Sequence, residues 1–241
     1  METKEYLKNA VFGSEEDTEF VEFFSNFAFD EVYNSNDLDD KTKYMAILAT
    51  LHGCQGIATY KKMLQAALEK ALTPIEIKEI TYQATAYLGI GRTMPFLETN
   101  NEILKERNIS LPLEGQSTTT PETRLHAGNQ VQIDIFGPQM KGFYENGPEE
   151  SVHINRWLSG NCFGDYYTRN GLDYSQREMI TFCFLLAQGG CEPQLIAHCQ
   201  ANMKIGNDKV FLIKVLSQCM PYIGYPRTLN ALRCINEAAK Q

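Results

Sequence analysis

Apolar, helix-favouring stretches alternate with short polar segments along the first half of the chain. Residues 44–51 are almost wholly apolar, which suits a buried helix, and residues 57–71 are rich in alanine, leucine and lysine. Residues 73–76 (Thr-Pro-Ile-Glu) are a strong helix start, because threonine can cap, proline suits the first helical position and glutamate can close a capping box. The helix that follows should end at Gly89, and a last helix should cover residues 95–106.

The second half repeats this plan. Ser175 and Glu178 have the spacing of a capping box, and the apolar helix that they open should run to about Ala187. Three further helices are predicted over residues 193–205, 208–220 and 226–239. With a helical lead-in before each set of four helices, the pattern predicts an all-α fold.

The chain also contains an internal repeat. Residues 29–43 return as residues 163–177 after 134 positions, and residues 87–93 return as residues 222–228 after 135 positions. A repeat of this length indicates a duplicated domain and not a solenoid. We therefore predict a duplicated helical bundle whose parts are a first repeat over residues 1–108, a polar linker over residues 109–126 and a second repeat over residues 127–241.

Composition narrows the class of function. The net charge of −8 and the absence of a basic stripe argue against nucleic acid and anionic membranes as partners. No apolar run approaches the roughly 20 residues of a membrane span, the N-terminus lacks a signal-peptide layout, and the 7 cysteines show no disulfide-scaffold spacing. These features favour a cytoplasmic protein with reduced thiols. No metal-ligand spacing, phosphate loop or dinucleotide motif is visible, so we expect no metal and no cofactor.

The candidate chemistry lies in the second half. An aromatic-rich segment over residues 163–178 ends in Arg177-Glu178, His198 is followed by Ala201 and Gly206, and a Tyr-x-Gly-x-Pro turn begins at Tyr222. In the order and spacing of these motifs the second half resembles the carboxymuconolactone decarboxylases, and more loosely the alkylhydroperoxidase-D-like proteins of the same superfamily. The resemblance covers residues 155–240 well and residues 25–108 more weakly.

The resemblance implies a site between helices in which the histidine and the upstream Arg-Glu pair do acid/base work on a small organic acid or lactone. Loss of CO₂ from a lactone acid generates an enolate-like charge, which needs stabilisation and an acid that returns a proton. We expect catalytic roles for His198, Glu178 and Cys191, and substrate-binding roles for Arg177, Gln194 and Tyr222.

Two other functions stay open. In the peroxidase-like branch Cys191 fits the first cysteine of a Cys-x-x-Cys pair, but Gln194 stands at the second position, which excludes a local disulfide. A thiol-dependent peroxidase would then need Cys191 as a low-pKa thiolate. The third possibility is a non-catalytic binding or assembly protein, in which Glu178 serves only the capping box and Cys191 is an inert buried residue.

The two repeats differ where the chemistry is expected. Lys43-Tyr44 stands where the second half has Arg177-Glu178, and Met63 stands near the position of His198. We therefore expect the first half to be a structural partner and the second half to carry any activity. Because the resemblance implies rings of subunits for single-copy relatives, we also predict a homotrimer of this duplicated chain.

Overall fold

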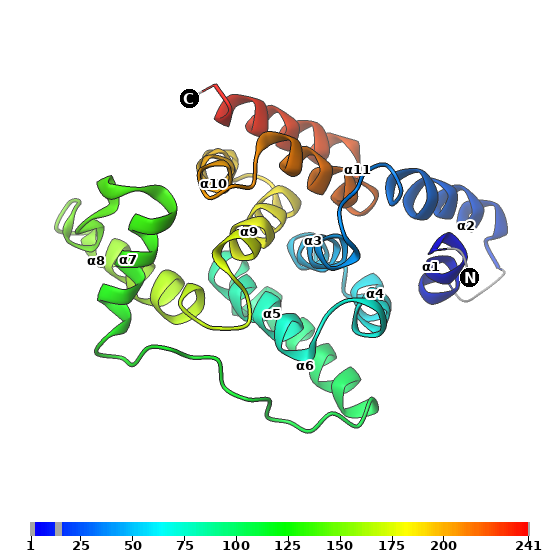
Figure 1. Cartoon of the computed structure of the whole chain (residues 1–241), viewed down its shortest axis with the longest axis horizontal. Coiled ribbons are helices and arrows are strands. Elements are labelled where there is room, and N and C mark those ends of the chain that lie inside the picture. Colours follow the sequence, from blue (N-terminus) through cyan, green and yellow to red (C-terminus); the bar gives the residue numbers. More distant parts are fainter. Residues whose placement is uncertain (1–2, 13–15, 241) are drawn as a thin grey trace.

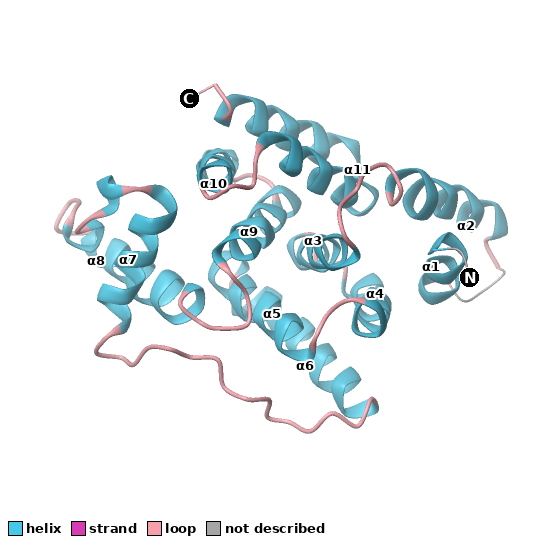
Figure 2. Ribbon diagram, in the orientation of Figure 1, coloured by secondary structure: helices cyan, strands magenta, loops and turns pink. Residues whose placement is uncertain are grey.

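The computed structural model describes residues 3–12 and 16–240, so the outer ends of the two predicted repeats, residues 1–2 and 241, lie outside it. Every regular element in this part is a helix (Figure 2). The helices of the first half are α1 (Thr3–Val11), α2 (Thr18–Ser25), the π-helical η1 (Asn26–Val32), α3 (Asp40–Gly53), α4 (Ile57–Lys70), α5 (Pro74–Leu88) and α6 (Ile90–Glu106). Those of the second half are α7 (Arg124–Phe136), η2 (Pro138–Met140), η3 (Phe143–Glu145), α8 (Val152–Trp157), the π-helical η4 (Leu158–Tyr167), α9 (Tyr174–Gln188), α10 (Glu192–Lys204) and α11 (Lys209–Ala238). None of the described helices is long and apolar enough to cross a membrane.

The internal repeat reappears as matching helices. Helices α3, α4 and α5 correspond to α9, α10 and the first part of α11, and α6 corresponds to the last part of α11. The break between α5 and α6 falls at Gly89, which has φ 80° and ψ 154°. Its equivalent, Gly224, bends α11 with φ 74° and ψ 171°, a backbone conformation that favours glycine. The predicted duplicated all-α fold is therefore confirmed.

The two halves share one main hydrophobic core. Helices α3 and α9 lie side by side at the centre of the molecule, and α5 and α11 pack against them (Figure 1). The core cluster includes Ile47 and Leu48 from α3 together with Phe182 and Phe184 from α9, all of them buried. A Cβ atom added to Gly53 would lie 2.6 Å from the Cβ atom of Ala187, so the two central helices approach too closely for a side chain. Neither half encloses this core alone.

Several predicted helix ends need correction. Helix α6 begins at Ile90 and contains Pro95 in its interior, whereas the sequence predicted a start at residue 95. Helix α11 continues through Pro221 until it bends at Gly224, so two predicted helices are one bent helix. Proline is tolerated inside both helices because burial of their apolar faces outweighs one lost backbone hydrogen bond. The predicted capping box of Thr73 and Glu76 is present.

The linker is extended and is tied to the second half. It runs along one edge of the molecule between α6 and α7 (Figure 1). The hydroxyl of Thr118 donates to the backbone oxygen of Thr168 at 2.7 Å, and the hydroxyl of Thr119 donates to that of Gly164 at 2.9 Å. Helix α7 begins at Arg124, so the linker ends three residues before the predicted boundary at residue 126.

Candidate active site

A carboxylate–imidazole pair joins α9 to α10. Glu178 is completely buried and His198 nearly so, and His198 Nδ1 lies 2.7 Å from Glu178 Oε2. The side-chain amide of Asn202 donates to the backbone oxygens of both residues, at 3.0 Å to Glu178 and 2.8 Å to His198. The crossing of two helices therefore fixes both members of the pair.

Glu178 does not belong to a capping box. The N-cap of α9 is Asp173, which forms a reciprocal capping box with Gln176, and the Ser175 hydroxyl instead donates to Asn207 Oδ1 at 2.6 Å. The purely structural explanation of Glu178 from the sequence is wrong, because the N-cap of the helix is Asp173, two residues before the predicted N-cap Ser175. A buried carboxylate needs hydrogen-bond donors, and Glu178 finds them in His198 and in Tyr167, whose hydroxyl donates to Oε1 at 2.7 Å.

Tyr167 connects this pair to the first half of the chain. Its hydroxyl lies 2.7 Å from Thr181 Oγ1 and 2.9 Å from the hydroxyl of Tyr87, which comes from α5. Burial raises the pKa of both tyrosines well above the ordinary value, and the charge of Glu178 raises the pKa of Tyr167 further. Both tyrosines therefore keep their hydroxyl hydrogens and act as neutral hydrogen-bonding groups.

A cavity of about 690 Å³ opens beside the pair, a size that suits a small organic molecule. Its lining is mainly apolar and includes Tyr87, Phe136, Cys162 and His198. The rings of Phe136 and Tyr87 meet the His198 ring edge to face, with centroids 5.4 and 5.6 Å away. Because Nδ1 of His198 is engaged by Glu178, Nε2 is the ring nitrogen available to a molecule in the cavity.

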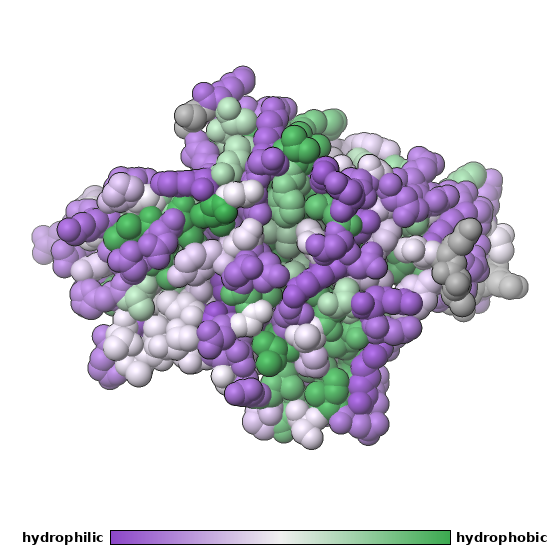
Figure 3. Space-filling view, in the orientation of Figure 1, coloured by the Kyte–Doolittle hydropathy of each residue, from purple (hydrophilic) through white to green (hydrophobic). Residues whose placement is uncertain are grey.

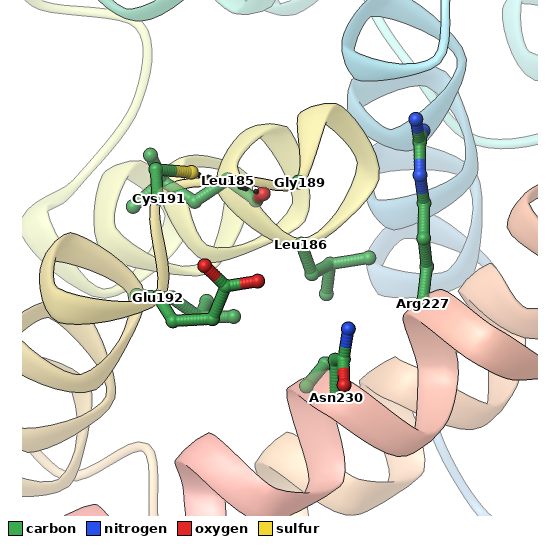
Figure 4. Close-up of a pocket in the computed structure, with 9 residues that line it drawn as sticks. Leu185, Leu186, Gly189, Cys191, Glu192, Arg227 and Asn230 are labelled. Carbon is green, nitrogen blue, oxygen red and sulfur yellow. Dashed lines mark hydrogen bonds between the residues drawn. The ribbon is translucent and has the colours of Figure 1, made fainter.

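Cys191 and Gln194 also line this cavity. Cys191 borders a second, much smaller pocket as well, which Figure 4 shows with Glu192, Arg227 and Asn230 around it. The Cys191 thiol donates to the backbone oxygen of Leu185 at 3.4 Å, the dashed line in Figure 4. Burial raises the pKa of this thiol above its ordinary value. The side chain is therefore a neutral thiol in the wall between two pockets.

Two predicted substrate-binding residues lie elsewhere. Arg177 is completely buried, and its guanidinium donates to Glu79 Oε2 at 3.0 Å and to Gln83 Oε1 at 2.8 Å, both on α5. Tyr222 packs against the core near Tyr44 in the first half. Neither lines the cavity. Packing of the halves against each other turns Arg177 toward α5, and it places Tyr87 at the cavity instead of Tyr222, its equivalent in the second repeat. The site that contains His198 receives Tyr87 from the first half in place of Tyr222.

Sequence reasoning missed Tyr87, Tyr167 and Cys162. The internal repeat contained a signal for Tyr87, since it aligns this residue with Tyr222, which was proposed for the site. In a pseudo-symmetric pair of repeats, a residue of one repeat can line the site of the other repeat in place of its equivalent there. Among the described residues, no cluster of His, Cys, Asp and Glu side chains could hold a metal ion.

The fold and the cavity together define a duplicated helical protein with a ligand-sized site where its two halves meet. A family model, the carboxymuconolactone decarboxylase family, matches residues 18–98 and 153–237, and the chain belongs to this family. The 4-carboxymuconolactone decarboxylase of Acinetobacter baylyi is 27% identical over 120 residues, which make up 49% of this chain and 89% of that protein. A solved structure from Burkholderia xenovorans, described as a gamma-carboxymuconolactone decarboxylase subunit, is 19% identical and has a TM-score of 0.57 over 98% of this chain and 97% of its own. The last likeness concerns the fold alone.

Proposed function

We propose that this protein is a decarboxylase-like enzyme that acts on a small organic acid or lactone by acid/base chemistry at His198. The observation that carries this proposal is the pairing of His198 with buried Glu178 at 2.7 Å, beside a cavity of about 690 Å³. Glu178 orients the ring, and Nε2 then gives or takes a proton at the cavity wall. The family match and the decarboxylase relative support the reaction class.

The chemistry balances without a further reactant. When the bond between the substrate carbon and its carboxylate breaks, CO₂ leaves and the electron pair stays on carbon as an enolate conjugated to the lactone carbonyl. As the lactone acid binds, Nε2 of the neutral His198 ring takes up a proton from water, and the protonated ring then gives this proton to the enolate carbon. The described residues that line the cavity include neither lysine nor arginine. A carboxylate there is poorly solvated, which favours its conversion to neutral CO₂, and the side-chain amides of Gln188 and Gln194 can donate to the enolate oxygen.

The test is direct measurement of turnover. Purified full-length protein is mixed with 4-carboxymuconolactone, and CO₂ release is followed together with loss of the substrate's absorbance. We expect one CO₂ to be released for each molecule of 4-carboxymuconolactone consumed, with saturation at increasing substrate. The proposal would be overturned if neither this lactone acid nor simpler lactone acids were turned over, and binding detected by calorimetry without turnover would favour the non-catalytic alternative.

The thiols favour this reading over a peroxidase. A peroxidatic cysteine needs a lowered pKa, whereas burial raises the pKa of Cys191. All 7 cysteines are free, which supports our inference of a reducing, cytoplasmic location. A non-catalytic binding protein is the remaining alternative. It would bind the lactone acid in the same cavity without releasing CO₂.

We also propose that the chain assembles as a homotrimer. Figure 3 shows apolar patches within a mainly hydrophilic surface. Exposed apolar side chains occur at equivalent positions of the two repeats: Ile90 with Tyr225, Met94 with Leu229, Phe20 with Ile154 and Phe23 with Trp157. A surface kept in both repeats suits contacts between copies around a closed ring. Light scattering should give about 82 kDa, three times the 27.3 kDa chain, and a 27.3 kDa species would contradict the proposal.

A further inference from the structure

We propose that Arg177 is a positioning residue that acts on His198 through a hydrogen-bond chain crossing both halves of the molecule. The members of this chain, in order, are Arg177, Gln83, Thr181, Tyr167, Glu178 and His198. The inference rests on the proposed role of His198, but the order of contacts is independent of any substrate. It gives the first half, through Gln83, a part in controlling the site.

Arg177 sets the direction in which hydrogens are donated along the hydrogen-bond chain. A guanidinium only donates hydrogen bonds, so the atom of Gln83 that faces Arg177 Nη1 at 2.8 Å must be the carbonyl oxygen Oε1. The amide nitrogen of Gln83 then faces the other way. It donates to Thr181 Oγ1 at 2.9 Å and to the backbone oxygen of Arg177 at 2.9 Å. The buried cation therefore fixes which way the Gln83 amide points.

The remaining hydrogens follow in sequence. Because Thr181 accepts from Gln83, its own hydrogen is free to donate to the Tyr167 oxygen at 2.7 Å, and Tyr87 can donate to that oxygen at 2.9 Å. Tyr167 then donates to Glu178 Oε1 at 2.7 Å. Both oxygens of Glu178 are acceptors, one from Tyr167 and one from His198 Nδ1–H. The neutral His198 ring thus carries its hydrogen on Nδ1 and presents an unprotonated Nε2 to the cavity.

The first half supplies an independent observation. At the positions equivalent to Thr181, Glu178 and His198 it has Ile47, Tyr44 and Met63, so three of the six members of the hydrogen-bond chain are missing. Tyr33 and Gln218 keep the residue types of Tyr167 and Gln83. The guanidinium is replaced by an ammonium group, since Lys43 stands at the position of Arg177 and lies over the ring of Tyr33 at 4.4 Å, and Gln218 donates instead to the Val32 backbone oxygen at 3.0 Å. A contact that only held the two halves together would be expected in both repeats, whether or not the repeat contains the histidine. Loss of the hydrogen-bond contacts together with the histidine is expected if these contacts serve it.

Nuclear magnetic resonance of the full-length protein, labelled with ¹⁵N at histidine, tests the proposal without substrate. The His198→Asn variant identifies the His198 signals. We expect the unliganded protein to show Nδ1 protonated and Nε2 unprotonated. Removing a donor upstream leaves Glu178 a stronger acceptor, because linked hydrogen bonds polarise one another, so the Nδ1 proton resonance should move downfield. The shift should be largest in Tyr167→Phe, smaller in Thr181→Val and smallest in Gln83→Met.

Matched variants separate this effect from a general loss of structure. Thr181→Ser keeps the hydroxyl and should restore the wild-type resonance. Thr93→Val removes a buried hydroxyl outside the chain, one that donates to the Gly89 backbone oxygen at 3.2 Å, and should leave the resonance unchanged. An Nε2-protonated ring, or a resonance that ignores Gln83→Met and Thr181→Val, would overturn the proposal. If the resonance moves as expected but no lactone acid is turned over, the hydrogen-bond chain stands and only the proposed reaction fails.

Discussion

The two halves of the molecule have corresponding main helices in the same order, but among the described residues the buried carboxylate–histidine pair beside the cavity of about 690 Å³ lies in the second half. In the second half, α9 and α10 bring Glu178 and His198 together. In the first half, α3 and α4 carry Tyr44 and Met63 at the equivalent positions, both of them buried. In the first half these positions therefore serve only the packing of the core. The first half is still required, because its helix α5 supplies Tyr87 to the cavity of the other half.

Two histidines show the same division. His52 in the first half has no exposed surface, stacks on Phe96 with ring centroids 4.2 Å apart, and uses both nitrogens on neighbours. These neighbours are the Leu48 backbone oxygen at 2.8 Å and Thr81 Oγ1 at 3.0 Å. His198 uses Nδ1 on Glu178 and turns its other edge to a cavity. A buried histidine is therefore a core residue in one half and a candidate catalytic residue in the other.

The largest expected effect comes from removing the polar pair. His198→Asn should lower turnover of 4-carboxymuconolactone by about 10²- to 10⁴-fold, the usual contribution of a positioned general acid. The matched change in the first half, Met63→Leu, should leave turnover within error, because Met63 only fills the core. Steady-state rates of the two variants and the wild type check this. An equal loss of turnover in both variants would contradict the assignment of activity to the second half.

The next effect concerns stability and pH. Burial lowers the pKa of His52 from 6.5 to about 4. Unfolded chains bind a proton at this histidine below about pH 6.5, and the native state does so only near pH 4. Stability should therefore be lost as the pH falls between these values, by about 3 kcal/mol from this group. Urea unfolding at about pH 7 and about pH 4 should show a smaller acid loss in His52→Gln than in wild type, whereas His126→Gln, at an exposed site, should behave as wild type.

A smaller effect is expected where the halves touch. Gly53→Ala places a Cβ atom 2.6 Å from the Ala187 Cβ atom and 2.7 Å from the Phe184 backbone oxygen, so α3 and α9 must separate. We expect a loss of about 1–3 kcal/mol in the free energy of unfolding. Gly91→Ala is the control, because nothing lies within 4 Å of an added Cβ atom in helix α6, and alanine there should be neutral or stabilising. A Gly53→Ala protein as stable as wild type would show that the shared core adapts.

The smallest effect is expected at Cys191. Since its thiol is a neutral donor to the Leu185 backbone oxygen, Cys191→Ser should keep most of the turnover of the lactone acid. Alkylation of Cys191 against pH should show no reactive thiolate near neutral pH, because burial raises its pKa. Rapid alkylation at neutral pH together with loss of a peroxide-reducing activity in Cys191→Ser would instead favour the peroxidase alternative.

The sequence predicted what depends on local signals. The capping box at Thr73 and Glu76, the stop at Gly89 and the cap at Asp208 are confirmed, because each uses residues a few positions apart. The start of α9 was misjudged because Asp173 and Ser175 both have capping-box spacing. Tertiary contacts decide between these two helix starts, since a helix that starts at Asp173 places Arg177 and Glu178 in the core.

The contacts between the halves could not be predicted in the same way. Arg177 has Glu79 and Gln83 as partners about 95 residues away along the chain, and only the packing of α5 on α9 brings them together. Tyr87 enters the site for the same reason. Sequence reasoning found the pair Glu178 and His198 through the family resemblance and through what the first repeat lacks, and it missed the residues that the first repeat contributes.

The most direct test is to see which half holds the ligand. A crystal structure of full-length His198→Asn soaked with 4-carboxymuconolactone would trap the substrate, since this variant should bind it without turning it over. We predict density in the cavity of the second half, against Tyr87 and residue 198. Density around Tyr33 and Tyr44 in the first half would contradict this prediction. An empty cavity would also contradict it if the wild-type protein releases CO₂ from this lactone acid.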